Sequence, residues 1–172
     1  MALSSNMISA ILTQNFISSN SMEALSLHAK KNMGERVDHS INYNSVEALF
    51  LLKSKKMQLV NNGKVLTIEQ SISKIRKQDK KVEQKCIVYS DLHKKGYIVK
   101  EGLKFGGDFR VYKENEKHAR WIVYVTSDKE KVDWRDFTAK SRVAHSSNKK
   151  ILLALVDSEG DINYYEISWI KP

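Results

Sequence analysis

The second half of the chain alternates short strand-forming segments with turns, and this pattern limits the possible folds most strongly. Five segments after Gly96 are rich in β-branched and aromatic residues: 97–99, 109–112, 121–126, 151–156 and 162–170. Such residues favour extended backbone, and the last segment alternates as a half-buried strand does. Between the third and fourth segments, Asp133 is a candidate N-cap for a helix on which Trp134, Phe137 and Ala144 share a face. We expect a C-terminal domain with a mixed, mostly antiparallel sheet flanked by helices.

The first half of the chain carries mainly helical patterns. Ser45 is a candidate N-cap for a helix over 45–57, and Thr67 begins a second helical pattern. A third helix is expected over 82–95. The short apolar stretch 8–12 suits a strand. A small domain of helices and strands is therefore predicted before the strand-rich half, so the whole chain belongs to the α+β class.

The charged stretch 77–85 is the expected connection between the two domains. A run of charges of this kind also suits a solvated helix face, so the connector can be helical throughout. We predict an N-terminal domain over residues 1–85 and a C-terminal domain over residues 86–172.

Composition excludes several classes of protein. The 172 residues include one cysteine, Cys86, which rules out an internal disulfide framework and a multi-cysteine zinc site. No apolar run approaches the roughly 18 residues of a membrane span. The opening MALSSNMISAIL lacks the basic start of a secretory signal. We expect a cytoplasmic protein that does not associate with membranes.

The charge balance indicates a polyanionic partner. The chain has 29 Lys and Arg residues against 20 Asp and Glu residues, which gives a formal net charge of +9. Basic side chains that neutralise phosphates release condensed counterions, and this release favours nucleic-acid binding. A basic RNA-binding module without any chemistry is one function that fits this balance.

Metal-dependent chemistry finds little support in the motifs. Asp157, Glu159 and Asp161 alternate like the start of a calcium loop, but Gly160 stands at the fourth position instead of the sixth. A tight acidic turn between two strands, with Gly160 at positive φ, is the better interpretation. The five histidines do not form the zinc-protease pair. We expect neither a metal nor another cofactor.

Three polar residues fall at predicted strand ends. Tyr112 ends one strand, His118 begins the next, and Lys149 lies at the start of the strand over 151–156. A phenol, an imidazole and an ammonium group can together cleave RNA by transesterification without a metal. One group takes the 2′-hydroxyl proton, one protonates the leaving 5′-oxygen, and the cation stabilises charge on phosphorus. Each residue alone also suits an ordinary structural role.

The segments FRVY, KHARWIVYV and RVAHSSNKKILLALVDSEGDINYYEISWIKP occur in this order between residues 109 and 172. With the preceding YSDLHKKGYIVKEGLKFGG, they resemble the catalytic domain of the archaeal tRNA-splicing endonuclease family, and weaker similarity continues through SVEALFLL. The resemblance implies a metal-independent endonuclease that excises introns from precursor tRNA at bulge–helix–bulge sites. Its products would carry 2′,3′-cyclic phosphate and 5′-hydroxyl ends.

The resemblance also implies roles for the three strand-end residues. Tyr112 would be the general base, His118 the general acid, and Lys149 would stabilise the transition state. Asn148 stands where the family often has an arginine, so one local positive charge is missing. The neighbouring Lys150 is the alternative cation, but strand alternation points it to the opposite side of the sheet.

Further residues are implied to contact RNA. Arg142, seven positions before Lys149, would stack on a bulged base, although a helix-end ion pair suits it equally. His145 is expected to form a local hydrogen bond and to take no part in the chemistry. The other expected RNA-binding residues are Lys104, Lys140 and Trp169.

Assembly is the last implication of the resemblance. The last strand, over 164–170, would pair between subunits, and the acidic loop of Asp157, Glu159 and Asp161 would insert into a basic cleft of another subunit. The chain would then form a homotetramer, or the catalytic half of a heterotetramer with a separate structural subunit. A non-catalytic structural subunit of the same complex is the alternative role.

Overall fold

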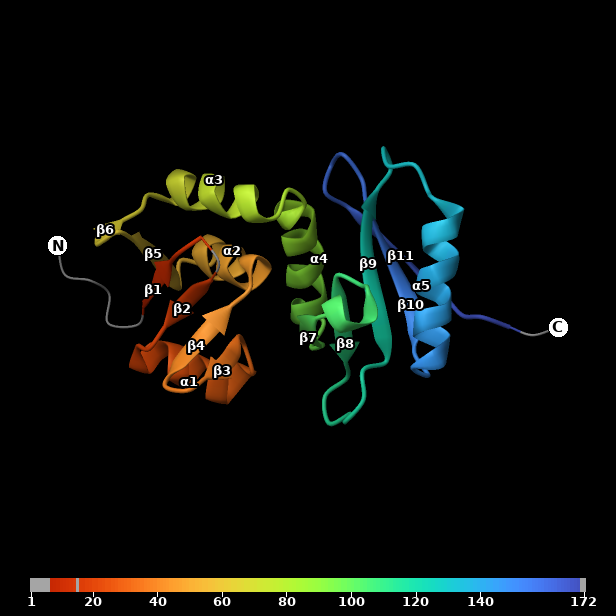
Figure 1. The fold of residues 1–172 in the computed structure, drawn as a ribbon, viewed down its shortest axis with the longest axis horizontal. Coiled ribbons are helices and arrows are strands. Elements are labelled where there is room, and N and C mark those ends of the chain that lie inside the picture. The colour runs from red at the N-terminus through yellow and green to blue at the C-terminus, as the bar shows by residue number, and fades with distance from the viewer. Residues whose placement is uncertain (1–6, 15, 171–172) are drawn as a thin grey trace. The chain divides into compact units, whose positions relative to one another are not determined.

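The computed structural model describes residues 7–14 and 16–170, and the chain divides into two compact units between Cys86 and Ile87 (Figure 1). Each unit contains its own β-sheet, of six strands in the first unit and five in the second. Helices accompany both sheets. The predicted α+β class is therefore confirmed.

The first unit is built on a mixed sheet with the strand order β3-β4-β2-β1-β5-β6, in which β1 and β5 are parallel. Its strands are β1 (Ile8–Leu12), β2 (Ile17–Ser19), β3 (Glu35–Val37), β4 (Ser40–Tyr43), β5 (Met57–Asn61) and β6 (Lys64–Val65). Its helices are α1 (Met22–Lys31), α2 (Ser45–Lys53) and α3 (Ile68–Gln78), and α4 (Val82–Lys94) crosses the boundary between the units. Helix α2 contacts β4 and β5, and it brings its own apolar side chains to the core.

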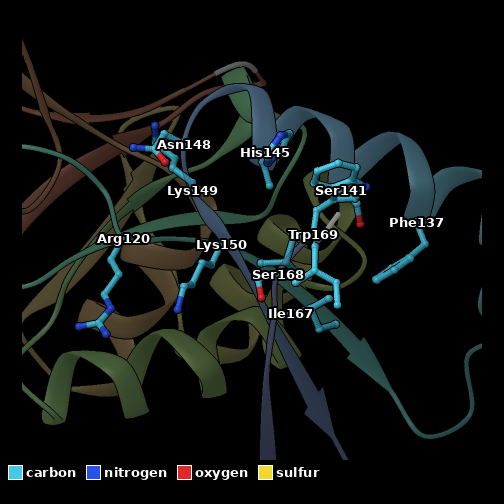
Figure 2. A pocket seen from close by; sticks show the side chains of 13 residues that line it. Arg120, Phe137, Ser141, His145, Asn148, Lys149, Lys150, Ile167, Ser168 and Trp169 are labelled. Carbon is cyan, nitrogen blue, oxygen red and sulfur yellow. The ribbon is translucent and has the colours of Figure 1, made fainter. Parts of the chain in front are cut away.

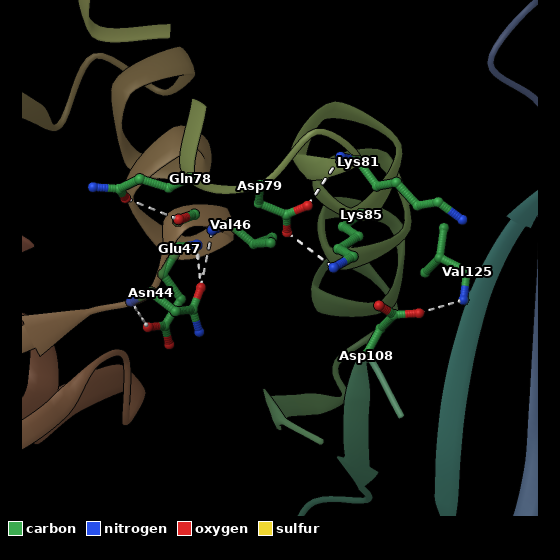
Figure 3. A network of polar contacts seen from close by, with 10 residues as sticks. Asn44, Val46, Glu47, Gln78, Asp79, Lys81, Lys85, Asp108 and Val125 are labelled. Atoms are coloured by element: carbon green, nitrogen blue, oxygen red, sulfur yellow. Dashed lines mark hydrogen bonds and ion pairs between the residues drawn. The ribbon is translucent and has the colours of Figure 1, made fainter. Parts of the chain in front are cut away.

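The start of α2 differs from the prediction. Its N-cap is Asn44 and not Ser45: the Asn44 side chain accepts hydrogen bonds from the N–H groups of Val46 and Glu47 (Figure 3). The Glu47 carboxylate accepts from the Asn44 N–H in return, which completes a capping box. The helix ends at Lys53 instead of residue 57, because Lys55 adopts a left-handed φ of +55° that helical backbone cannot continue.

The connector between the units is not helical throughout. Asp79 ends α3 in an extended conformation, and its carboxylate accepts a hydrogen bond from the Lys81 N–H at 2.9 Å (Figure 3). The same carboxylate pairs with Lys85 at 2.9 Å. Helix α4 then begins at Val82, whose side chain is fully buried.

The second unit contains a sheet with the strand order β11-β10-β9-β8-β7. Its elements are β7 (Ile98–Glu101), the 3-10 turn η1 (Leu103–Phe105), β8 (Phe109–Tyr112), β9 (Trp121–Ser127), α5 (Trp134–Ser146), β10 (Lys150–Val156) and β11 (Ile162–Ile167). Strands β9 and β10 are parallel and the other neighbours are antiparallel. The sheet is thus mixed and mostly antiparallel, as predicted.

Helices cover both faces of this second sheet. Tyr89 of α4 packs on Phe109 of one face, with ring centroids 6.0 Å apart. On the other face, Ala144 of α5 packs with Ile122 and Ile151. Trp134 meets Phe137 of the same helix edge-on, with ring centroids 5.8 Å apart, but its side chain is 71% exposed. None of the helices within the described residues is long and apolar enough to cross a membrane.

Candidate active site

The strand register brings the predicted chemistry to one end of the second sheet. Val111 of β8 pairs with Trp121 of β9, and Trp121 pairs with Lys150 of β10. One residue beyond these pairs, at the same end of the sheet, Arg120 lies between Tyr112 and Lys149. The Arg120 N–H donates to the Val111 carbonyl at 2.8 Å, and the Lys150 N–H donates to the Arg120 carbonyl at 3.3 Å. Tyr112 and Lys149 thus lie at the same end of the sheet, on either side of the segment that leads into β9.

Tyr112 is half-buried at the end of β8. It lies two residues from Arg110, so both side chains emerge on the same face of the sheet. The Arg110 guanidinium carbon is 5.9 Å from the centroid of the Tyr112 ring. The Arg110 Nε atom is buried and has no hydrogen-bond partner among the described residues. A cation therefore stands beside the phenol.

His118 lies in an exposed loop and does not begin β9, which starts three residues later at Trp121. The loop after Tyr112 turns through a hydrogen bond from the Glu116 N–H to the Lys113 carbonyl, at 3.1 Å. Ala119 is buried directly after His118, and it anchors the end of the loop beside the sheet. The imidazole is solvent-accessible within this short, anchored segment.

Lys149 is held immediately before β10. Asn148 adopts a left-handed φ of +54°, and the Lys149 N–H donates to the Ala144 carbonyl at 2.9 Å. Asparagine tolerates this conformation better than most residues, which gives a local physical reason for Asn148. The Lys149 ammonium donates to the Ser147 carbonyl at 2.8 Å and lies 4.8 Å from the centre of the Phe105 ring.

Lys150 occupies the opposite face of the sheet, as strand alternation predicts. Its ammonium pairs with Glu166 of β11, whose other carboxylate oxygen accepts from the Trp121 indole N–H at 2.7 Å. The hydrogen bond from Lys150, and to a lesser extent that from Trp121, lowers the pKa of the Glu166 carboxyl. Figure 2 shows that the side chains of Lys149 and Lys150 diverge. The two adjacent lysines therefore have separate partners.

A cavity of about 630 Å³ lies beside Lys149 (Figure 2). Phe137, Trp169 and other apolar side chains form part of its wall, and Arg120, Lys149 and Lys150 contribute cations. Apolar walls suit a flat, unpaired nucleobase, while the cations suit the attached phosphates. Tyr112 and His118 do not line this cavity.

The residues predicted to bind RNA have different surroundings. Trp169 is 55% exposed in the cavity wall, with its ring centroid 4.6 Å from that of His145. Arg142 and Lys104 are exposed outside the lining. Lys140 pairs with Asp136 at 2.6 Å and covers the Tyr124 ring. Of the four residues predicted to bind RNA, Trp169 is thus the one that lines the cavity.

Sequence reasoning missed the lining role of α5. The His145 ring lies beside the Trp169 ring, with centroids 4.6 Å apart and the ring planes tilted by 41°. Phe137, Ser141 and His145 all line the cavity. Their spacing of four residues along one helix was the available signal, because residues four apart share a face.

The acidic segment forms the predicted tight turn between β10 and β11. The Asp157 carboxylate accepts from the N–H groups of Glu159 and Asp161, both at 2.9 Å, and Gly160 has a φ of +90°. Glu159 and Asp161 are exposed. The described residues contain no group of three His, Cys, Asp or Glu side chains placed to hold a metal ion.

Comparison with known proteins gives consistent matches. A family model described as tRNA intron endonuclease, catalytic C-terminal domain, matches residues 82–164. The tRNA-splicing endonuclease of Pyrococcus abyssi is 36% identical over 145 residues, which cover 84% of this chain and 85% of that relative. The enzyme of the same name from Methanothermobacter thermautotrophicus is 35% identical over 150 residues, 85% of this chain and 87% of the relative. That of Nanoarchaeum equitans is 34% identical over 137 residues, 74% and 88% respectively.

Proposed function

The chain belongs to the tRNA intron endonuclease family, and from that premise we propose that it excises introns from precursor tRNA by metal-independent cleavage. The reaction is a transesterification within the RNA. The 2′-oxygen beside the scissile bond attacks phosphorus, and the 5′-oxygen of the next nucleotide leaves. The products carry a 2′,3′-cyclic phosphate and a 5′-hydroxyl. Three side chains, Tyr112, His118 and Lys149, supply the chemistry.

Tyr112 takes the proton of the 2′-hydroxyl, His118 gives a proton to the leaving 5′-oxygen, and Lys149 stabilises the charge that develops on phosphorus. The observation that carries this proposal is the strand register, in which Tyr112 and Lys149 flank Arg120 at one end of the sheet. His118 lies two residues before Arg120. The Lys149 ammonium donates only to a carbonyl among its hydrogen bonds in the described residues, and it forms no ion pair there, so its charge is available to a phosphate.

The substrate we propose is RNA with a bulge–helix–bulge. Duplex RNA is recognised by shape, whereas bulged nucleotides can be splayed out and stacked on planar side chains. The cavity beside Lys149 supports this choice, because its size and the Trp169 ring suit an unpaired base. Arg142 stacks on a bulged base in this proposal, and the exposed Lys104 and the half-buried Lys140 contact the phosphate backbone.

Two bulges must be cut at a fixed separation, so we propose an assembly with two active sites related by symmetry. Strand β11 forms one edge of its sheet, and an edge strand can pair with another subunit. The exposed carboxylates of Glu159 and Asp161 suit a basic cleft on a neighbouring subunit. The assembly is a homotetramer, or a heterotetramer with a structural subunit.

The experiment incubates the purified chain with a bulge–helix–bulge RNA in excess EDTA and identifies the new ends. Cleavage to cyclic-phosphate and 5′-hydroxyl ends is expected. His118→Ala and Lys149→Met should each reduce the cleavage rate by about 100-fold or more while RNA binding is largely retained. His39→Ala, a change at an exposed histidine of the first unit, is the matched control and should cleave normally.

Three other outcomes separate the alternatives. Cleavage that EDTA abolishes, or 3′-hydroxyl products, would reject the mechanism. If His118→Ala cleaves and binds the RNA as the wild-type chain does, a basic RNA-binding module without chemistry would be favoured. Activity that appears only when a second subunit is added would indicate the heterotetramer, and loss of the rescue with His118→Ala would identify this chain as its catalytic half.

A further inference from the structure

We propose that Glu166 is a positioning residue that fixes the first residues of β9 and β10, which follow the segments carrying His118 and Lys149. The inference rests on the proposed function and adds a role that the family comparisons do not assign. Glu166 lies on β11, and its carboxylate joins the first residue of β9 to the first residue of β10. It thereby links the two chain segments that deliver the proposed acid and cation.

The contacts of this carboxylate are divided between two strands. One oxygen of Glu166 accepts from the indole N–H of Trp121 at 2.7 Å, and the other pairs with the Lys150 ammonium. Trp121 and Lys150 are direct partners in the parallel register of β9 and β10. A single side chain therefore holds both members of the terminal pair of this ladder, and we call the three residues the Glu166 clasp.

The clasp fixes Trp121 together with two further contacts. The Tyr97 ring meets the indole edge-on at a centroid distance of 5.4 Å, and the Arg120 guanidinium carbon is 4.8 Å from the indole centre. The indole N–H points to Glu166, so the carboxylate determines the orientation of the ring within this packing. His118 precedes Trp121 by three residues, and the only residues between them are Ala119 and Arg120.

The clasp acts on Lys149 through the next residue. Lys150 is the first residue of β10, and its ion pair with Glu166 holds its side chain on the opposite face of the sheet from Lys149. With Lys150 engaged, Lys149 is the cation of the pair that remains on the Phe105 side. Within the described residues, the hydrogen bonds of the Glu166 carboxylate go to Trp121 and Lys150 and not to His118 or Lys149, so its influence on the chemistry passes through Trp121 and Lys150.

Small displacements of catalytic groups are costly. Reacting groups must lie within a few tenths of an ångström of the productive geometry, and a shift of about 1 Å can reduce the rate about 100-fold. Loss of the clasp should therefore lower kcat, because it loosens the acid and the cation relative to each other. RNA affinity depends on many distributed phosphate contacts, so KM should change little.

The test measures kcat and KM on the bulge–helix–bulge RNA for Glu166→Ala and Glu166→Gln. We expect kcat to fall 10- to 100-fold in Glu166→Ala with KM within about twofold of wild type. Glu166→Gln keeps an oxygen for the Trp121 indole but loses the ion pair with Lys150. Its kcat should therefore lie between those of wild type and Glu166→Ala. Glu101→Gln, at an exposed glutamate of β7, is the matched control.

A second set of variants tests the route of the effect. In a Trp121→Phe/Lys150→Met background, both partners of Glu166 are absent, so adding Glu166→Ala should change kcat less than about threefold. An equally large fall in that background would overturn the proposal, because Glu166 would then act elsewhere. The proposal also fails if Glu166→Ala keeps wild-type kcat, or if only KM changes.

Two controls separate this inference from the proposed function. The native mass of each variant is measured, because β11 is also the strand proposed to pair between subunits; a fall in kcat that follows a fall in mass would overturn the positioning role. Wild-type cleavage with inactive His118→Ala supports the proposed function independently of Glu166. A wild-type chain that cleaves no RNA, alone or with a partner subunit, rejects both proposals.

Discussion

Tyr164 shows how one hydroxyl couples a helix to an edge strand. Its O–H donates to the Asp91 carboxylate of α4 at 2.8 Å, and Lys95 pairs with the same carboxylate at 2.6 Å. Burial raises the pKa of the Tyr164 phenol well above its usual range, and the bond to Asp91 raises it further. Ionisation of this phenol is therefore linked to stability.

The direction of that link gives a prediction. The folded-state pKa of Tyr164 is higher than the unfolded value of about 10, so its contribution is fully present below about pH 10 and is lost as pH rises beyond it. Tyr164→Phe should cost about 1 kcal/mol at pH 8 and lessen the loss of stability between pH 10 and 11. Urea unfolding at these pH values measures both effects. Tyr165→Phe, at an exposed neighbouring residue, is the control and should resemble wild type. If Tyr164→Phe loses as much stability as wild type between pH 10 and 11, the Tyr164 phenol is not the group that titrates.

At the same scale, alternation along β10 was enough to predict that Lys149 and Lys150 take opposite faces. It was not enough to predict their partners. Glu166 lies 16 residues beyond Lys150 and 45 beyond Trp121, and only the antiparallel return of β11 brings it to them. The contact between the His145 and Trp169 rings has the same origin. Local periodicity assigns a side chain to a face, whereas its contacts depend on which strands are neighbours.

At the scale of the element, the turn from β7 to β8 depends on two glycines with different roles. A Cβ atom at Gly102 would lie 2.7 to 2.8 Å from backbone atoms of Phe109, which cannot move without disturbing β8. A Cβ atom at Gly106 would meet nothing within 4 Å, although its φ of +70° disfavours other residues. This turn carries Phe105, which supports Lys149. A substitution at Gly102 therefore tests steric clash, and a substitution at Gly106 tests backbone strain.

Gly102→Ala should destabilise the second unit by about 2 to 4 kcal/mol, since overpacking against backbone leaves no flexible side chain to yield. Gly106→Ala should cost about 1 kcal/mol, the usual penalty for a left-handed non-glycine residue. Urea midpoints of both variants beside wild type make the comparison. Equal costs at the two positions would show that the Phe109 backbone relaxes.

Elements with strong local signals were predicted within a few residues. The strands of the second unit, the helix starts at Thr67 and Asp133, and the end of α4 before Gly96 all lie close to their expected positions. Before residue 40, β1 was the one element expected, and α1, β2 and β3 were not. Strands β2 and β3 have three residues each, too few for a periodic signal, and they form because β1 and β4 lie beside them.

At the scale of the whole molecule, the surface combines an excess of positive charge with one concentrated acidic turn. The chain carries a formal net charge of +9, while Asp157, Glu159 and Asp161 lie within five residues. Asp157 is occupied in holding the turn together, as it accepts from two backbone N–H groups. The Glu159 and Asp161 side chains are exposed, so they are the carboxylates able to meet a basic surface on another copy.

If the chain forms the proposed homotetramer, reversal of these two charges should break the assembly without unfolding the turn. For Glu159→Lys/Asp161→Lys, we expect sedimentation to show a fall from about four times the 19.8 kDa chain mass to about twice, because pairing through β11 remains.

Glu35→Lys/Glu114→Lys, at exposed glutamates outside the turn, reverses the same number of charges and should leave the mass unchanged. If both double variants lose mass equally, overall charge and not the acidic turn governs assembly. A wild-type chain that stays at two copies until another subunit is added would favour the heterotetramer, in which the turn meets the structural subunit.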